Sequence, residues 1–215
     1  MRLLEIAVTC CNLNAKERSH CHADSATAYR TLLAIDRRLD EWVADLPPRF
    51  AYKRILAKPL ERDAFFGEYD VYRNHVAASI WNRYRCIRIS ACEALLRYES
   101  LPTEPVRTNV VQREDVQQRG RRCLVQMSGD ICYSVHFYLH CQGGSEACDG
   151  DESPGLTMYG GTALVVPLSF AERACPALSD TRTWIRSQIG KITERTGVTP
   201  AKIPTDGHEV VDSPN

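Results

Sequence analysis

Four long stretches of this sequence repeat apolar residues every three or four positions, and this period constrains the fold more than any other feature. Apolar residues spaced in this way share one face of an α-helix. The expected helices are 25–46, 69–98, 110–139 and 180–196. No Asn-Gly or Asp-Gly turn joins two alternating runs, so almost no β-strand is expected. The predicted fold class is therefore all-α, an irregular multi-helix bundle.

Local signals mark the ends and weak points of these helices. Pro47 ends the first helix, because proline lacks the N–H that the next turn needs. Asp180 is expected to cap the fourth helix, and Gly197 to end it. Gly120 and Gly129 each cost the third helix about 1 kcal/mol of propensity. A bend or break is expected at one of these glycines.

The four helices predict one helical domain over residues 1–203. Segment 142–161 is rich in Gly, Ser, Asp and Glu, so a mobile loop is expected there, between the third and fourth helices. Segment 164–174 contains Pro167 and could form a short helix with that proline in its first turn or a buried extended piece; the short helix is preferred. Residues 204–215 are expected to be a flexible tail.

Charge and hydropathy exclude two classes of partner. The 27 Lys and Arg residues balance 27 Asp and Glu residues, which removes the phosphate attraction of a typical nucleic-acid binder. Arg119, Arg121 and Arg122 form one short basic run beside Glu114 and Asp115. No direct DNA binding by this chain is expected. No apolar run approaches the ~20 residues of a membrane span, so no membrane association is expected.

Ten cysteines occur without any Cys-x2-Cys pair, and most are expected to be reduced, small apolar residues of helices. The densest cluster of metal-ligand types comprises Cys10, Cys11, His20, Cys21 and His22. Its spacing disfavours zinc, because structural zinc sites use ligands two to four residues apart on tight turns. Helical cysteines followed by exposed loop histidines are the preferred interpretation, and no metal site is predicted.

The second helix carries Trp81, Arg85, Arg88 and Cys92 beside its apolar stripe. Both arginines are expected at the edge of the core, where each needs an acidic or carbonyl partner. A structural ion pair between two helices is preferred, and an anion or ligand site in a bundle pocket stays open.

Enzyme signatures are absent from the sequence. It contains no phosphate loop, no Gly-x-Gly-x-x-Gly, no His-Glu-x-x-His and no Gly-x-Ser-x-Gly. His136 and His140 stand four apart, a spacing that can hold a metal, but surface or interface histidines are preferred. Thus no catalytic or cofactor-binding residue is predicted, and the chain is not expected to be an enzyme. Trp42, Trp81 and Trp184 are expected to be largely buried.

Five short segments stand in a fixed order between residues 28 and 200. They are Leu39-Asp40-Glu41-Trp42 with Leu46-Pro47-Pro48, Trp81 to Ile89, Asp130 to Val135, Pro167-Leu168, and Arg182 to Ile185. Their order and spacing resemble the large helical regulatory region of fungal binuclear zinc-cluster transcription factors. The sequence departs from that family at His136, where a proline and a glycine usually follow, and at Val166, where an aromatic residue usually stands.

The resemblance implies an α-helical regulatory or interaction domain of a nuclear transcription factor. The family's six-cysteine DNA-binding cluster is missing from this sequence, which leaves a fragment, a truncated gene product and a stand-alone relative as open origins. The implied partners are proteins of the transcription machinery, a second copy of the chain, or a small-molecule effector between the helices. A stand-alone chain without a nuclear signal is expected in the cytoplasm. The alternative functions are an independent metal-binding protein and an unrecognised helical enzyme.

Overall fold

The helical period is realised as six α-helices in the computed structural model, which describes residues 2–18, 25–59, 63–100, 110–140 and 158–198. The elements are α1 Arg2–Arg18, α2 Ser25–Ala44, a 3₁₀ helix Pro48–Phe50, β1 Tyr52–Leu56, β2 Glu68–Tyr72, α3 His75–Ser100, α4 Val110–His140, α5 Met158–Ala174 and α6 Asp180–Thr196. The predicted all-α multi-helix fold is confirmed.

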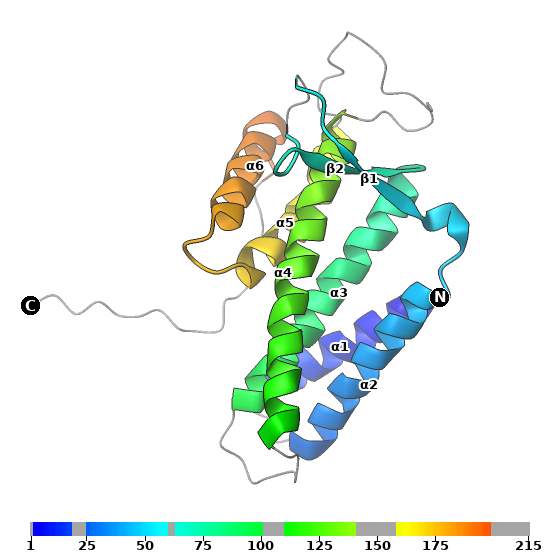
Figure 1. Ribbon diagram of the computed structural model, residues 1–215, viewed down its shortest axis with the longest axis vertical. Coiled ribbons are helices and arrows are strands. Elements are labelled where there is room, and N and C mark those ends of the chain that lie inside the picture. The colour runs from blue at the N-terminus through cyan, green and yellow to red at the C-terminus, as the bar shows by residue number, and fades with distance from the viewer. Residues whose placement is uncertain (1, 19–24, 60–62, 101–109, 141–157, 199–215) are drawn as a thin grey trace, which may run out of the picture.

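Helices α3 and α4 form the central pair, and the other elements pack around them (Figure 1). The two helices are antiparallel: Ser79 meets Tyr138 at one end, with 3.1 Å between their hydroxyl oxygens, and Leu96 meets Gly120 towards the other. Helices α1 and α2 lie against α3, whereas α5 contacts both central helices and α6 packs on α5. The β1–β2 hairpin covers the C-terminal half of α4.

The predicted apolar stripe of α2 faces the core. Leu32, Ile35 and Leu39 are fully buried there, at the spacing that the sequence predicts. Burying each such side chain stabilises the fold by about 1.5–3 kcal/mol. The period of the sequence therefore reports the packing face of this helix directly.

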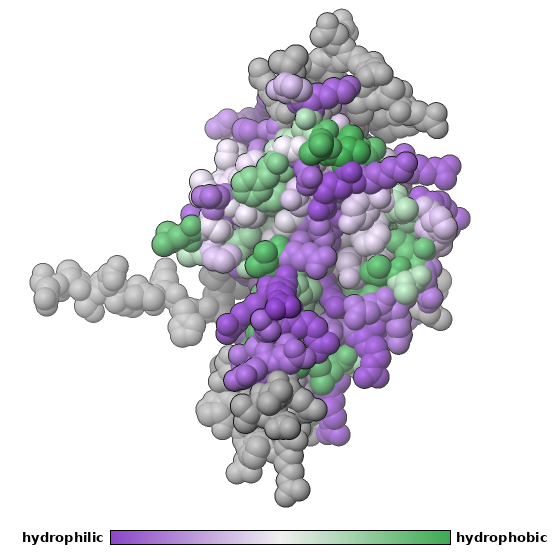
Figure 2. Space-filling model, viewed as in Figure 1, coloured by the Kyte–Doolittle hydropathy of each residue, from purple (hydrophilic) through white to green (hydrophobic). Residues whose placement is uncertain are grey.

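The expectation of almost no strand is confirmed for the described residues, which contain one two-stranded hairpin. Strands β1 and β2 pair antiparallel, with Tyr52 opposite Tyr72 and Leu56 opposite Glu68. The link between them is longer than a two-residue turn, so the usual hairpin signal is missing. Leu56 is exposed, and apolar side chains appear on the surface near β1 (Figure 2).

The second helix begins later in the structure than the sequence predicts. Residues 69–72 belong to β2, and α3 begins at His75. The Asn74 side chain accepts a hydrogen bond from the Ala77 backbone N–H at 2.9 Å, which satisfies one of the free donors at the helix start. The helical period of the sequence continues backwards through Tyr72, so period alone could not locate this boundary.

The third predicted helix is not broken, since α4 is one unbroken helix through Gly120 and Gly129. Gly120 is buried, and a Cβ added there would lie 3.2 Å from Leu96 Cδ2 of α3. The missing side chain at this position lets the two central helices approach closely.

The C-terminal helices differ from their predictions in detail. Helix α5 starts at Met158, so residues 158–161 are helical rather than part of the predicted 142–161 loop, whose other residues lie outside the described ranges. Pro167 therefore lies inside α5 and not in its first turn. The cap of α6 is Ser179, whose side chain accepts from the Arg182 N–H, rather than Asp180.

Helix α6 ends at Gly197 as predicted, in the left-handed conformation with φ of 69°. The predicted tail 204–215 lies outside the described residues. Trp42, Trp81 and Trp184 are each partly buried against the core, and none is exposed. Trp42 packs on Trp81 with ring centroids 6.2 Å apart, which joins α2 to α3.

Candidate functional site

Arg85 is completely buried, not at the edge of the core as predicted. Its guanidinium lies 3.2 Å from Asp70 Oδ2 and donates to the Tyr72 hydroxyl at 2.8 Å and to Asn82 Oδ1 at 2.9 Å. The acidic partner comes from β2, so this ion pair fixes the hairpin to α3 and does not join two helices. Its enclosure excludes Arg85 from binding a diffusing ligand.

A second arginine, which the sequence analysis did not single out, completes this network. Arg54 of β1 contacts Asp70 Oδ1 and Asp130 Oδ1, each at 2.8 Å. Its guanidinium also lies 3.6 Å from the centroid of the Tyr133 ring. Asp70, Asp130 and the Tyr133 ring all contact Arg54 within the protein, so this network holds the fold together.

Arg88 confirms the predicted ion pair between two helices. From α3 it reaches two acids of α2, Asp36 Oδ1 at 3.2 Å and Asp40 Oδ1 at 2.9 Å. It also donates to the Asp36 backbone carbonyl at 2.8 Å. These contacts leave Arg88 almost buried but at the wall of an open pocket.

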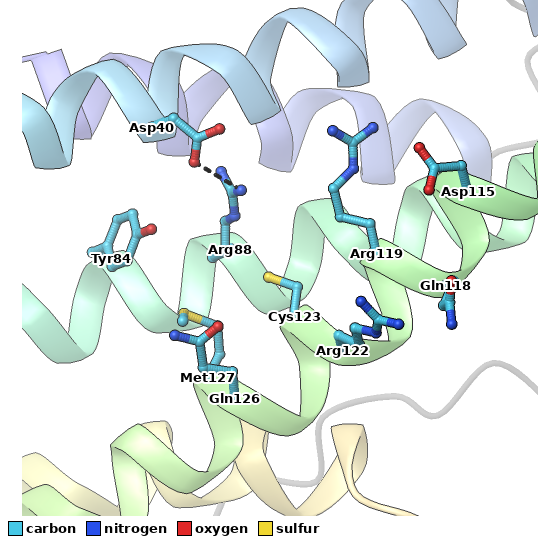
Figure 3. A pocket seen from close by; sticks show the side chains of 10 residues that line it. All are labelled: Asp40, Tyr84, Arg88, Asp115, Gln118, Arg119, Arg122, Cys123, Gln126 and Met127. Atoms are coloured by element: carbon cyan, nitrogen blue, oxygen red, sulfur yellow. Dashed lines mark ion pairs between the residues drawn. The ribbon is translucent and has the colours of Figure 1, made fainter. Parts of the chain in front are cut away.

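This pocket lies between α2, α3 and α4 and has a volume of about 430 Å³ (Figure 3). It is lined by Asp40, Tyr84, Arg88, Asp115, Gln118, Arg119, Arg122, Cys123, Gln126 and Met127. Its size falls in the range of small-molecule sites, roughly 300–1,000 Å³. The pocket provides the space that the open alternative, an anion or ligand site beside Arg88, requires.

The lining residues give the pocket an apolar wall and a charged rim. Tyr84 and Met127 are nearly buried, and burial raises the pKa of Tyr84 to about 12, which keeps its hydroxyl neutral. Arg119 and Arg122 stand on the exposed side of α4. With Arg88 they make three cations against two aspartates, a net charge of +1. The surface over the N-terminal half of α4 is correspondingly hydrophilic (Figure 2).

Two thiols meet beside Arg88. Cys92 of α3, Cys123 of α4 and Arg88 line one small cavity of about 20 Å³ between the helices. The sulfur of Cys123 points towards the Arg88 side chain (Figure 3). The neighbouring Cys92 thiol, followed by Arg88 with its positive charge, outweighs burial and lowers the pKa of the Cys123 thiol.

The N-terminal metal-ligand cluster gains no support. Cys10 and Cys11 are helical, as preferred, but Cys10 is buried in the core while Cys11 is exposed. Consecutive helical residues point in different directions, so these two thiols do not face one ligand. His20, Cys21 and His22 lie outside the described residues. The seven described cysteines are all free thiols.

The histidine pair of α4 is not a surface pair. His136 is buried against Tyr69 of β2, with ring centroids 3.9 Å apart, because the hairpin covers this face of α4. His140 Nε2 lies 3.1 Å from Asp63 Oδ2, and Lys191 Nζ lies 2.8 Å from Asp63 Oδ1. In the described part of the chain, no three His, Cys, Asp or Glu side chains gather in a group that could hold a metal ion.

Among the described helices, none is both long and apolar enough to span a bilayer. Comparison with known proteins finds no matching family model, no similar curated protein and no similar solved structure.

Proposed function

We propose that this chain is a regulatory module of the kind found in fungal binuclear zinc-cluster transcription factors, and that it acts without binding DNA itself. Two lines of support come together. The five segments of the sequence resemble that family's regulatory region in order and spacing. The described helices surround an open pocket of about 430 Å³ between segments far apart in the chain. The pocket is the observation that carries the proposal.

In this proposal the pocket holds a small-molecule effector with a carboxylate or phosphate group. Arg119 and Arg122 offer donors that match both groups. Tyr84 and Met127 offer apolar contact to the rest of the ligand. An effector held between α2, α3 and α4 stabilises one arrangement of these helices over another, and such a difference in affinity between two states is what regulation requires.

A reporter assay in fungal cells tests the function. The chain is fused to a heterologous DNA-binding domain, and transcription is compared with that from the DNA-binding domain alone. The fusion is expected to change reporter output, and the double variant Arg119→Ala/Arg122→Ala to abolish the change. Arg121→Ala is the matched control, because Arg121 is exposed on the same turn of α4 but does not line the pocket.

Two results would contradict the proposal. A fusion with the same output as the DNA-binding domain alone argues against a regulatory module. Equal effects of Arg121→Ala and the double variant argue against the pocket. Circular dichroism of the purified variants establishes that each is folded. A labelled duplex titrated with the isolated chain should show affinity no better than about 10⁻⁴ M at physiological salt, the weak end of non-specific binding.

A further inference from the structure

The contact between Cys92 and Cys123 is set by the packing of the two central helices. Leu96 of α3 meets Gly120 of α4, and one turn along the antiparallel pair Cys92 and Cys123 line the same small cavity. Because Gly120 has no side chain, the helices approach closely at this level. Both thiols are therefore held together by rigid elements.

The two thiols differ in their access to solvent. Cys123 lines the open pocket of about 430 Å³. Cys92 is buried, and it lines a narrow cavity of about 20 Å³, which has room for about one water molecule. A small reagent reaches Cys123 first, and Cys92 stands directly behind it.

The surroundings of Cys123 favour its thiolate. Arg88 lies beside Cys123 at the wall of the pocket, and the acids Asp36 and Asp40 of α2 are paired with Arg88. The thiolate is the nucleophilic form of cysteine, and a neighbouring cation stabilises it. Cys92 has the opposite character, since the neighbouring Cys123 and burial raise the pKa of its thiol.

We propose that Cys123 is a site of oxidation by hydroperoxides and that Cys92 is the thiol that resolves it. The Cys123 thiolate attacks the terminal oxygen of the hydroperoxide, the O–O bond breaks, and the alcohol leaves after taking up a proton. Cys123 is now a sulfenic acid. The Cys92 sulfur then attacks the Cys123 sulfur, and water leaves with the Cys92 proton. Two thiols lose two electrons to the hydroperoxide and become one disulfide between α3 and α4.

This site does not depend on the proposed regulatory function, and a purified chain suffices to test it. The reduced protein is treated with hydrogen peroxide, and its cysteines are assigned by peptide mapping with mass spectrometry. The wild-type chain is expected to form a Cys92–Cys123 disulfide. Cys92→Ala is expected to stop at a sulfenic acid on Cys123, which dimedone traps. Cys123→Ala is expected to leave Cys92 unmodified.

Cys11 is the internal control, because it is the exposed cysteine of α1. Cys123 is expected to react on the order of tenfold faster than Cys11 at neutral pH, despite its lower exposure. Arg88→Lys retains the charge and should retain most of that advantage, whereas Arg88→Met should move the pH profile of Cys123 alkylation upward. Circular dichroism of each variant separates these effects from unfolding.

Two results would overturn the proposal. The first is a folded wild-type protein in which peroxide oxidises Cys11 before Cys123. The second is a peptide map in which Cys123 is oxidised but no link to Cys92 forms.

Discussion

Replacing Asp70 with asparagine should destabilise this protein more than any change to a surface ion pair. Asp70 and Arg85 pair with side chains 0% and 1% exposed. Asp70→Asn retains the shape and one acceptor oxygen but removes the negative charge. Arg85 is then a buried cation without its counterion. Removing one partner of a buried pair typically costs about 3–5 kcal/mol.

The structure argues for the upper part of this range. The Asp70 carboxylate also accepts from the Tyr72 hydroxyl at 3.1 Å and from Arg54 Nε at 2.8 Å. An amide replaces one of these acceptors with a donor, so a second contact is lost together with the charge. Total stabilities of single domains are about 5–15 kcal/mol, and the loss is a large share of that.

Urea denaturation followed by circular dichroism measures the free energy of unfolding. The control is Glu172→Gln on α5, whose pair with Arg186 is 2.7 Å long but has side chains 26% and 60% exposed. That change should cost no more than about 1 kcal/mol. The double variant Asp70→Asn/Arg85→Met removes the orphaned charge and should be more stable than Asp70→Asn alone. A loss below about 1 kcal/mol for Asp70→Asn would refute the reasoning.

Two further predictions concern helix packing and acid stability. Gly190→Ala on α6 places a methyl group in open space and should raise the free energy of unfolding by about 1 kcal/mol. Gly120→Ala should raise it less because the methyl group meets Leu96, and Gly120→Val should lower it by about 1–3 kcal/mol. An equal gain in stability from alanine at both glycines would contradict the close approach of α3 and α4. Hydrogen bonds from its histidine and lysine partners hold the pKa of Asp63 well below its usual range. The resulting stability is present above pH of about 4 and lost as pH falls, so in acid titrations Asp63→Asn should remove on the order of 1 kcal/mol of acid sensitivity.

The helices with a clean apolar period were predictable, and the hairpin was not. Helix α2 is predicted by Leu32, Ile35 and Leu39, which recur at helical spacing and are all buried in the core. Tyr69 and Tyr72 are three residues apart and fit a helical period as well as a strand. What makes them a strand is pairing with β1, a contact between segments that local pattern cannot reveal.

Arg85 and Arg88 show the same difference between what local sequence predicts and what tertiary packing decides. Both were predicted to need acidic partners, because a guanidinium beside an apolar stripe cannot stay unpaired. The prediction for Arg88 held, whereas Arg85 lies deeper than expected because β2 covers it and supplies Asp70. The depth of each arginine depends on what packs over α3, and the period of α3 itself does not carry that information.

The pairing of Cys92 with Cys123 could not be predicted from the sequence around either residue. The sequence predicts that Gly120 weakens α4, because glycine has a low helix propensity. Its role in this fold is steric: a side chain larger than a methyl group there would clash with Leu96 and push the two central helices apart. The proximity of Cys92 and Cys123 therefore depends on Gly120. The sequence shows that this glycine lowers helix propensity, but only the packing of α3 on α4 shows that it lets the two helices approach. If Gly120→Val separates the helices as argued, peroxide should no longer close the disulfide, although both cysteines and Arg88 are still present.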